Sequence, residues 1–271
     1  MDSNLNSWSE EDSRIYHQLA TAAVPEREEQ IATLLSLLPF AIDQGFGAVE
    51  LGCGEGFLSQ ALLEAFPASS VLSLDGSEEM RAMTANRLSP HSGRFEVAAF
   101  ELGSQSWWPR LDGADAVISS LCLHHLPNTA KQQLYRGIFE TLKPGGAFLV
   151  IDLLEPSHSR ARELLADQWD AATRRRSIDL TGTEALYERF LAEKWNHYRY
   201  PDSVDLPSPL PDHLKWLREA GFESADAFSV SAGHAVFGGF KRSTREIPQP
   251  RLTLDLAHRA VDRAFSRAGS C

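Results

Sequence analysis

The chain of 271 residues is 43% hydrophobic and 23% charged, a composition that supports one large buried core. Its formal net charge of −11 at pH 7 disfavours a nucleic-acid partner, because phosphate contacts are built from clustered Lys and Arg. No run approaches about 18 consecutive apolar residues, and the N-terminus is not basic, so the sequence predicts neither a membrane span nor a signal peptide.

Two helices are predicted before the first strand, over residues 10–23 and 26–38, and Pro25 separates them. The second carries Ile31, Leu34 and Leu35 on one face, a spacing that is typical of an amphipathic helix. These helices therefore precede the core as a separate N-terminal layer.

The segment Gly52-Cys53-Gly54-Glu55-Gly56 follows an apolar strand at 47–51 and precedes the helical apolar pattern of 57–66. Glycines at a strand-to-helix turn allow positive φ angles and let backbone amides approach a polar ligand. Alone, the pattern also fits an ordinary tight turn. We predict that it binds a ligand because of the residues that follow.

A second strand at 71–74 ends in Asp75, about twenty residues after the glycines, where an α/β nucleotide fold places a carboxylate that binds ribose. Asp75 is also placed to cap the next helix, which begins near Ser77. Ser77 fills that capping role better. We therefore predict that Asp75 contacts a ribose diol.

Strands alternate with helices through residue 154, which predicts a parallel sheet with helices on both faces and a ligand site at the carboxyl ends of its strands. The remaining core strands are predicted near 94–98, 115–119 and 147–152. A helix over 129–142 ends at Lys143-Pro144-Gly145-Gly146, because proline and glycine do not continue it.

The pattern changes after the core into a predicted helical cap and a final strand pair. Helices are expected over 160–175, 183–195 and 210–220, and two strands follow Phe222 with their turn at 231–234. The resulting division has one domain at 1–242 and an extension at 243–271 with a helix over 252–265. Within the domain we expect N-terminal helices at 10–38, a core at 45–154, a cap at about 155–208, and a final helix and hairpin at 209–242.

Four motifs in this order resemble the class I S-adenosylmethionine-dependent methyltransferases of the bacterial small-molecule type. They are the glycine segment after Glu50, Asp75-Gly76-Ser77 with Met80, the run Asp115–Leu126 with Ser119 and His124-His125, and Lys143–Gly146. The resemblance covers about residues 45–155, with a similar tail to about 241. It implies a Rossmann-like, seven-stranded, mostly parallel sheet with an antiparallel last strand, S-adenosylmethionine as cofactor, and a small-molecule substrate.

The resemblance also implies which residues hold the cofactor. Glu50 and the Gly52 backbone would bind the amino-acid part, and Arg27 would pair with its carboxylate unless it balances Glu28 and Glu29 on the surface. Many relatives carry an acidic residue at the position of Ala99, so the adenine contact there is in doubt, with Glu101 as a substitute. The full predicted set is Tyr16, Arg27, Glu50, Gly52, Gly54, Asp75, Gly76, Met80, Ala99, Phe100 and Ser119.

Three histidines are candidates for a general base, because imidazole titrates close to working pH. His124 and His125 follow the fourth strand, where the family brings substrate to the methyl group, and His234 lies at the tip of the last hairpin. A histidine at these places also serves structure through a backbone hydrogen bond. Asp152, at the end of the fifth strand, would orient one of them or bind substrate.

The predicted cap supplies an aromatic set with one cation, namely Trp169, Trp195, His197, Tyr198, Arg199 and Tyr200, of which Trp195, Arg199 and Tyr200 are the predicted substrate residues. Such residues suit an aromatic or carboxylate-bearing substrate. They also occur as plain core between a cap and a domain. Both interpretations stay open from sequence.

Alternatives from other classes are weaker. An NAD-linked oxidoreductase prefers GxGxxG to the pattern here. A metal site would gather His124, His125, Asp152, His197 and His234, but their spacing matches no ligand motif, so we predict no metal. The sequence also allows a cofactor-binding protein without catalytic activity. It does not determine the acceptor atom or the oligomeric state.

The three cysteines, Cys53, Cys122 and Cys271, lie in unrelated contexts and leave one unpaired in any pairing. Reduced thiols in a cytoplasmic protein fit best. Arg174-Arg175-Arg176 is predicted to lie on a solvated helix face. We therefore expect a small-molecule partner, with neither a nucleic acid nor a membrane.

Overall fold

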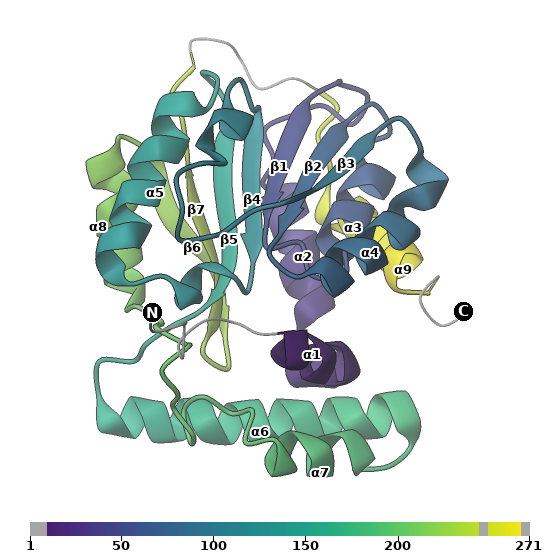
Figure 1. The fold of residues 1–271 in the computed structure, drawn as a ribbon, viewed down its shortest axis with the longest axis vertical. Coiled ribbons are helices and arrows are strands. Elements are labelled where there is room, and N and C mark those ends of the chain that lie inside the picture. The colour runs from purple at the N-terminus through teal and green to yellow at the C-terminus, as the bar shows by residue number, and fades with distance from the viewer. Residues whose placement is uncertain (1–9, 244–248, 267–271) are drawn as a thin grey trace, which may run out of the picture.

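The computed structural model describes residues 10–243 and 249–266. A central sheet separates two layers of helices, and a further helical layer crosses below the sheet (Figure 1). The strands are β1 (Gly47–Leu51), β2 (Ser70–Asp75), β3 (Phe95–Ala99), β4 (Ala116–Ser120), β5 (Ala147–Leu153), β6 (Glu223–Ser231) and β7 (His234–Phe240). The helices include α1 (Glu10–Ala23), α2 (Arg27–Ser36), α3 (Phe57–Ala65), α4 (Glu78–Leu88), α5 (Asn128–Thr141), α6 (Ser159–Thr181), α7 (Ala185–Ala192), α8 (Leu210–Ala220) and α9 (Leu254–Ser266).

The seven strands form one sheet in the order β3-β2-β1-β4-β5-β7-β6. The pairs from β3 to β5 are parallel, whereas β7 is antiparallel to both β5 and β6. The strand order reverses between β1 and β4, which is where open α/β sheets bind ligands at the carboxyl ends of the strands. The predicted fold class is confirmed.

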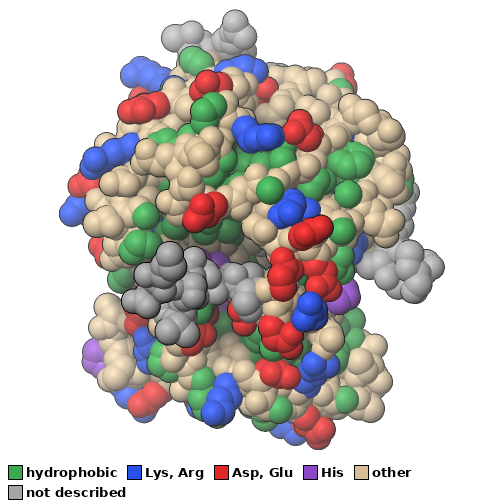
Figure 2. All heavy atoms as spheres, viewed as in Figure 1, with side chains coloured by type: hydrophobic (Ala, Val, Ile, Leu, Met, Phe, Trp, Pro, Cys, Tyr) green, Lys and Arg blue, Asp and Glu red, His purple; other side chains and the backbone are tan. Residues whose placement is uncertain are grey.

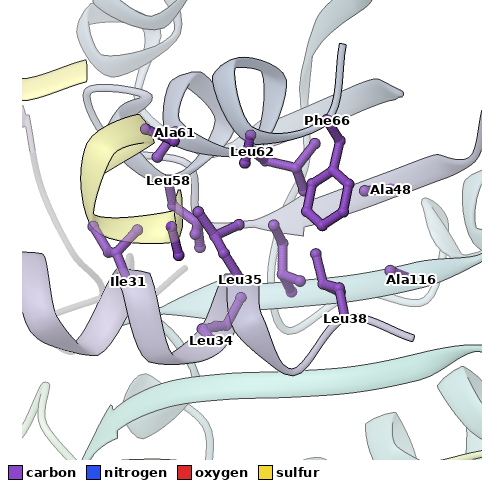
Figure 3. Close-up of a cluster of buried hydrophobic side chains, with 14 of the residues drawn as sticks. Ile31, Leu34, Leu35, Leu38, Ala48, Leu58, Ala61, Leu62, Phe66 and Ala116 are labelled. Carbon is purple, nitrogen blue, oxygen red and sulfur yellow. The ribbon is translucent and has the colours of Figure 1, made fainter. Parts of the chain in front are cut away.

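Alternation along the strands divides the core between the two faces of the sheet. Ala48 and Ile118 point to the face that α2, α3 and α9 cover, whereas Val49 and Val117 point to the face that α5 and α8 cover. Figure 3 shows the first cluster, with leucines of α2 packed between α3 and the sheet. Each face of the sheet is therefore closed by helices, and the strand ends are left for a site.

A third apolar cluster joins α1, α6 and α7 to the ends of the strands. Trp169 of α6 donates its indole N–H to the Ala23 carbonyl at 2.6 Å. The Tyr198 hydroxyl donates to the carbonyls of Leu154 and Gly233, at 2.7 and 2.9 Å. These bonds hold the helical layer, which we call the cap, across the carboxyl ends of β5 and the β6–β7 turn (Figure 1).

Most predicted elements are confirmed, with shifted ends where a local signal was missed. Helix α6 continues to Thr181, because nothing in the sequence breaks it before Gly182, which takes a left-handed φ of 71°. Helix α7 ends at Ala192, and Lys194 shortly after it has a φ of 53°. A short 3-10 turn, Leu123–His125, was not predicted.

The described part of the C-terminal extension packs on the body of the domain. Ala257, Ala260 and Val261 of α9 are fully buried against α2 and α3, and Phe265 stacks on Phe57 at a centroid distance of 4.3 Å. Residues 244–248 and 267–271, which include Cys271, lie outside the described residues. Within the described ranges, no helix is both long and apolar enough to span a membrane.

Candidate functional site

The glycine segment between β1 and α3 has the geometry that its sequence predicts. Gly52, Gly54 and Gly56 have φ angles of 70°, 52° and 81°, in the left-handed region that favours glycine. A Cβ at Gly52 would lie 2.5 Å from the Cys122 side chain, and one at Gly56 would lie 3.0 Å from Thr84. A Cβ at Gly54 would meet no atom within 4 Å. Gly54 therefore faces open space, where a ligand can approach the backbone.

Asp75 ends β2 beside this turn. Its two carboxylate oxygens accept hydrogen bonds from the backbone N–H groups of Gly54, at 2.8 Å, and Ser77, at 2.9 Å. The hydroxyl of Ser77 accepts from the Met80 N–H and caps α4, as predicted. Burial raises the pKa of Asp75 above its usual value, against the hydrogen bonds that lower it. Asp75 is thus fixed in orientation, with its remaining lone pairs toward the adjoining cavity.

A cavity of about 520 Å³ lies over the carboxyl ends of β1, β2 and β4. It gathers most of the predicted cofactor residues, and Glu101, the predicted substitute for Ala99, also lines it. Ala99 and Ser119 do not line it, since Ala99 pairs with Asp75 in the sheet and Ser119 donates to the Leu51 carbonyl at 2.8 Å. The predicted residues that do line it are Tyr16, Arg27, Glu50, Gly52, Gly54, Asp75, Gly76, Met80, Phe100 and His125.

One end of this cavity carries a buried glutamate, Glu50, and a buried arginine, Arg27. Glu50 is 1% exposed and accepts from the Ser59 hydroxyl, and burial raises its pKa to about 8. The Nε and Nη1 atoms of Arg27 are buried without a hydrogen-bond partner among the described residues. The Arg27 guanidinium lies 4.8 Å from the Phe57 ring centroid. An unsatisfied guanidinium and a carboxyl group in one cavity fit the carboxylate and ammonium of an amino acid.

The surface alternative for Arg27 is wrong. Glu28 pairs with Arg176 of α6. Glu29 lies 2.6 Å from Nε2 of His258 in α9. The two acids that would have balanced Arg27 are therefore engaged elsewhere, and Arg27 is directed into the cavity.

The 3-10 turn after β4 places two histidines at the edge of this cavity. His124 Nδ1 lies 2.5 Å from a carboxylate oxygen of Asp152, which is fully buried at the end of β5. Burial alone would raise the pKa of Asp152, but the charge and hydrogen bond of His124 outweigh it and hold that pKa low. Burial likewise opposes the charged form of His124, and Asp152 outweighs burial and raises the pKa of His124. Asp152 therefore orients His124, one of its two predicted roles. It lines neither cavity, so the predicted substrate contact of Asp152 is not supported.

Asp205 completes this group and was not predicted. Its carboxylate lies 3.5 Å from His124 Nε2, 3.3 Å from His125 Nδ1 and 3.6 Å from His197 Nδ1. Ligand atoms of His124, His125 and Asp205 lie within 4.8 Å of one another, so they are able to hold a metal ion. Asp152, His197 and His234, the other members of the metal alternative, are outside that group.

A second cavity, of about 200 Å³, adjoins the first and shares Tyr16, Leu121 and Val204 with it. It lies between the cap and the strand ends. His124, Trp195, Tyr200 and His234 line it, and so do Trp169 and His197 of the predicted cap set. Asp205, which was not predicted, lines it as well. The first cavity has the predicted cofactor features, so the second is the candidate acceptor site.

The surroundings of His234 and Arg199 do not suit the roles predicted for them, a general base and a substrate contact. His234 is 1% exposed, packs edge-on against Trp169, and has its pKa lowered to about 4 by burial. It is therefore neutral near pH 7. Arg199 does not line the acceptor cavity, because its guanidinium pairs with Asp167 and Asp170 at 2.7 and 2.6 Å.

The chain matches known methyltransferases. Residues 48–146 match a methyltransferase domain family model. Curated relatives include trans-aconitate 2-methyltransferases of Variovorax paradoxus, 29% identical over 52% of both chains, and of Streptomyces avermitilis, 27% identical over 86% of this chain and 92% of the relative. The chain spans about half the length of the first of these relatives.

Solved structures share the fold at low sequence identity. An O-methyltransferase family protein from Burkholderia thailandensis has a TM-score of 0.60 at 16% identity, covering 88% of this chain and 61% of that one. Human N-acetylserotonin methyltransferase in complex with SAM has a TM-score of 0.54 at 18% identity, covering 87% and 57%. The family model thus places a methyltransferase domain at residues 48–146, and the sheet order and the solved structures show that the chain has the class I methyltransferase fold.

Proposed function

We propose that this protein transfers a methyl group from S-adenosylmethionine to a small molecule held in the second cavity. The observation that carries the proposal is the junction of two cavities, one with the cofactor features and one bordered by an oriented histidine. When bound, S-adenosylmethionine supplies a methyl group on a positively charged sulfonium. The relatives named for trans-aconitate support a small-molecule acceptor.

The first cavity holds the cofactor through groups at both of its ends. Arg27 pairs with the amino-acid carboxylate, and Glu50 with the ammonium. Asp75 accepts hydrogen bonds from the ribose hydroxyls, since its orientation is set by Gly54 and Ser77. Gly76, Met80 and Phe100 line the cavity where the resemblance places adenine.

His124 is the proposed general base. Its Nδ1 is engaged by Asp152, so Nε2 is the nitrogen directed toward the second cavity and Asp205. Nε2 accepts the proton of an acceptor hydroxyl, amine or thiol, and Asp152 stabilises the imidazolium that forms. His125 lines the cofactor cavity and shapes the boundary between the two ligands. His234, neutral and set against Trp169, contributes to the far wall.

The N-terminal helix closes the cofactor cavity. Glu10 of α1 accepts from the Ser77 hydroxyl at 2.7 Å and from the Glu78 N–H at 3.0 Å. These contacts join α1 to the start of α4 beside Asp75. Closure of this kind excludes water from the reacting centre and holds the acceptor in line with the methyl group.

We also propose a cytoplasmic location, with neither a nucleic acid nor a membrane as partner. Cys53 and Cys122 are buried free thiols, and burial raises the pKa of both. Arg174 and Arg176, from the arginine run, pair with Glu184 and Glu28. This pairing favours a structural role for the run over recognition of a polyanion.

The test is transfer of labelled methyl from S-adenosylmethionine into a fractionated cell extract. We expect label in the small-molecule fraction, and none with the Asp75→Ala variant. Label in RNA or protein would contradict the small-molecule acceptor. A parallel reaction with EDTA addresses the metal alternative, which predicts that chelation abolishes transfer. No label with protein that binds S-adenosylhomocysteine would favour a silent binding protein.

A further inference from the structure

The lining of the acceptor cavity is acidic, which does not suit trans-aconitate, the tricarboxylate for which the curated relatives are named. Resting on the proposed function, we infer that this cavity selects an acceptor bearing an ammonium group and rejects polycarboxylates such as trans-aconitate. Four acidic residues line the cavity, namely Asp12, Glu193, Asp202 and Asp205, of which Glu193 also pairs with Arg189. Among its described lining residues, Lys194 is the sole Lys or Arg.

The nearby arginines do not add positive charge to the cavity. Arg199 pairs with Asp167 and Asp170 on α6 and is absent from the lining. Arg162, whose guanidinium carbon lies 5.8 Å from the Tyr198 ring centroid, pairs with Glu155. Arg27 lines the cofactor cavity and not the acceptor cavity, and in the proposed function it binds the amino-acid part of the cofactor. A tricarboxylate in the acceptor cavity would therefore meet like charge on several sides without an arginine fork to bind it.

A buried polar atom points to a ligand beside these acids. His197 is 5% exposed, and its Nδ1 has no hydrogen-bond partner among the described residues. That nitrogen faces the Asp205 carboxylate at 3.6 Å, a distance that leaves both groups able to bind a third. An ammonium donates up to three hydrogen bonds and so satisfies a carboxylate and an imidazole nitrogen together.

Asp202 adds charge at the mouth of the cavity. Its carboxylate accepts from the backbone N–H groups of Val204 and Asp205, at 2.8 and 2.9 Å. These bonds fix the loop that carries Asp205 and keep the Asp202 charge beside the cavity. Figure 2 shows acidic side chains gathered at the boundary between the body and the cap, and α1, which lies at this boundary, begins with the acids Glu10, Glu11 and Asp12.

Aromatic rings supply the rest of the wall. Tyr16 and Trp195 lie 6.3 Å apart between centroids, and Trp169 and Tyr200 line the same cavity. The faces of such rings are electron-rich and attract organic cations. Acids and aromatic rings together favour an amine, whereas rings with arginine would have favoured a carboxylate.

The experiment compares pairs of molecules that share a ring and carry either an ammonium or a carboxylate on a short side chain. Tyramine and 4-hydroxyphenylacetate share a phenol ring, and histamine and imidazole-4-acetate share an imidazole ring. Binding of each to protein saturated with S-adenosylhomocysteine is measured by calorimetry, beside trans-aconitate. We expect each amine to bind at least tenfold more tightly than its acid, and trans-aconitate to bind more weakly than either amine.

Variants assign the preference to the cavity. Asp202→Asn keeps the acceptor oxygen and removes the charge, so we expect it to reduce the amine preference at least threefold. Glu163→Gln, an exposed acid of α6 outside the cavity, serves as the matched control and should leave the preference unchanged. Saturation by S-adenosylhomocysteine is confirmed first, so failure there counts against the proposed function. With saturation confirmed, a preference for the acids, or no preference, overturns this inference.

Discussion

The two cavities are built in different ways. The cofactor cavity rests on short, local segments at strand ends, and backbone N–H groups and glycines shape much of it. The acceptor cavity is assembled from α1, the turn after β4, the cap and the loop at 200–205, and side chains shape it. The shape of the cofactor cavity is therefore constrained by the fold itself, whereas the shape of the acceptor cavity changes with the cap. Substitutions should therefore separate binding of the cofactor from turnover of the acceptor.

The largest expected effect comes from the histidine at the junction. His124→Gln should lower kcat about 10²- to 10⁴-fold, because a positioned general base contributes roughly that factor. Asp152→Asn should lower kcat as well, since it removes the charge that stabilises the His124 imidazolium. The dissociation constant of S-adenosylhomocysteine, measured by calorimetry, should change less than about twofold for both variants, because His124 borders the acceptor cavity.

The control for these variants is His258→Gln, which alters an exposed histidine of α9. It should leave kcat unchanged. A His124→Gln enzyme with normal kcat would show that the histidine serves only the structure of the turn.

Asp75→Asn tests the cofactor cavity. The variant loses charge-assisted hydrogen bonds to the ribose diol, worth roughly 1.5–3 kcal/mol each. We expect S-adenosylhomocysteine to bind about 100-fold more weakly, since about 1.4 kcal/mol corresponds to a factor of ten. Asparagine keeps one acceptor oxygen for the loop, and Asp43→Asn, an exposed acid with no role in either cavity, is the control. Equal affinity for the two variants would exclude ribose binding by Asp75.

Glu50 makes cofactor binding dependent on pH. Burial raises its pKa to about 8, so below that value the free protein carries a proton there. Pairing with the cofactor ammonium requires the carboxylate, so binding releases this proton and strengthens as pH rises. Affinity for S-adenosylhomocysteine should increase up to about tenfold per pH unit between about 5.5 and 7.5, where the α-amino group is still mostly protonated.

The Glu50→Gln variant should bind S-adenosylhomocysteine weakly, and its affinity should not increase with pH in this way.

The raised pKa of Glu50 also makes the stability of the free protein depend on pH. Because the folded pKa is raised above the unfolded value, the contribution of Glu50 is greatest below the unfolded pKa and is lost as pH approaches 8. Wild type should thus lose thermal stability relative to Glu50→Gln as pH rises from 5 to 8 in the absence of ligand. Parallel curves for the two proteins would contradict the raised pKa.

The cofactor half was predictable because its signals are local. Glycines at a strand-to-helix turn and an acid at the end of the next strand keep their spacing whatever the rest of the chain does. The structure accordingly places Gly54 and Asp75 in direct contact. Ala99 and Ser119 were predicted from matching positions alone. Ala99 pairs with Asp75 in the sheet, the Ser119 hydroxyl donates to the Leu51 carbonyl, and neither residue lines the cavity.

The acceptor half was less predictable because its residues meet only in three dimensions. Nothing in the spacing of Asp202 and Asp205 ties them to the histidines after β4. Leu206 connects them, since its N–H donates to the His124 carbonyl at 2.8 Å and its own carbonyl accepts from Lys131. The same loop conformation determines which cap residues face inward, and spacing alone could not show that His197 lines the cavity and Arg199 does not.

The smallest expected effect is that of Arg199→Ala. The sequence left a substrate contact of Arg199 open, whereas in the structure its guanidinium pairs with both Asp167 and Asp170. Exposed ion pairs contribute about 0–1 kcal/mol, so the variant should lose little thermal stability. Its KM for the acceptor should change less than about twofold in steady-state kinetics, whereas Tyr200→Ala, which alters a residue of the lining, should raise KM more. A large rise for Arg199→Ala would mean that the cap rearranges around the acceptor and carries this cation inward, and the acidic character of the cavity would then describe the free protein alone.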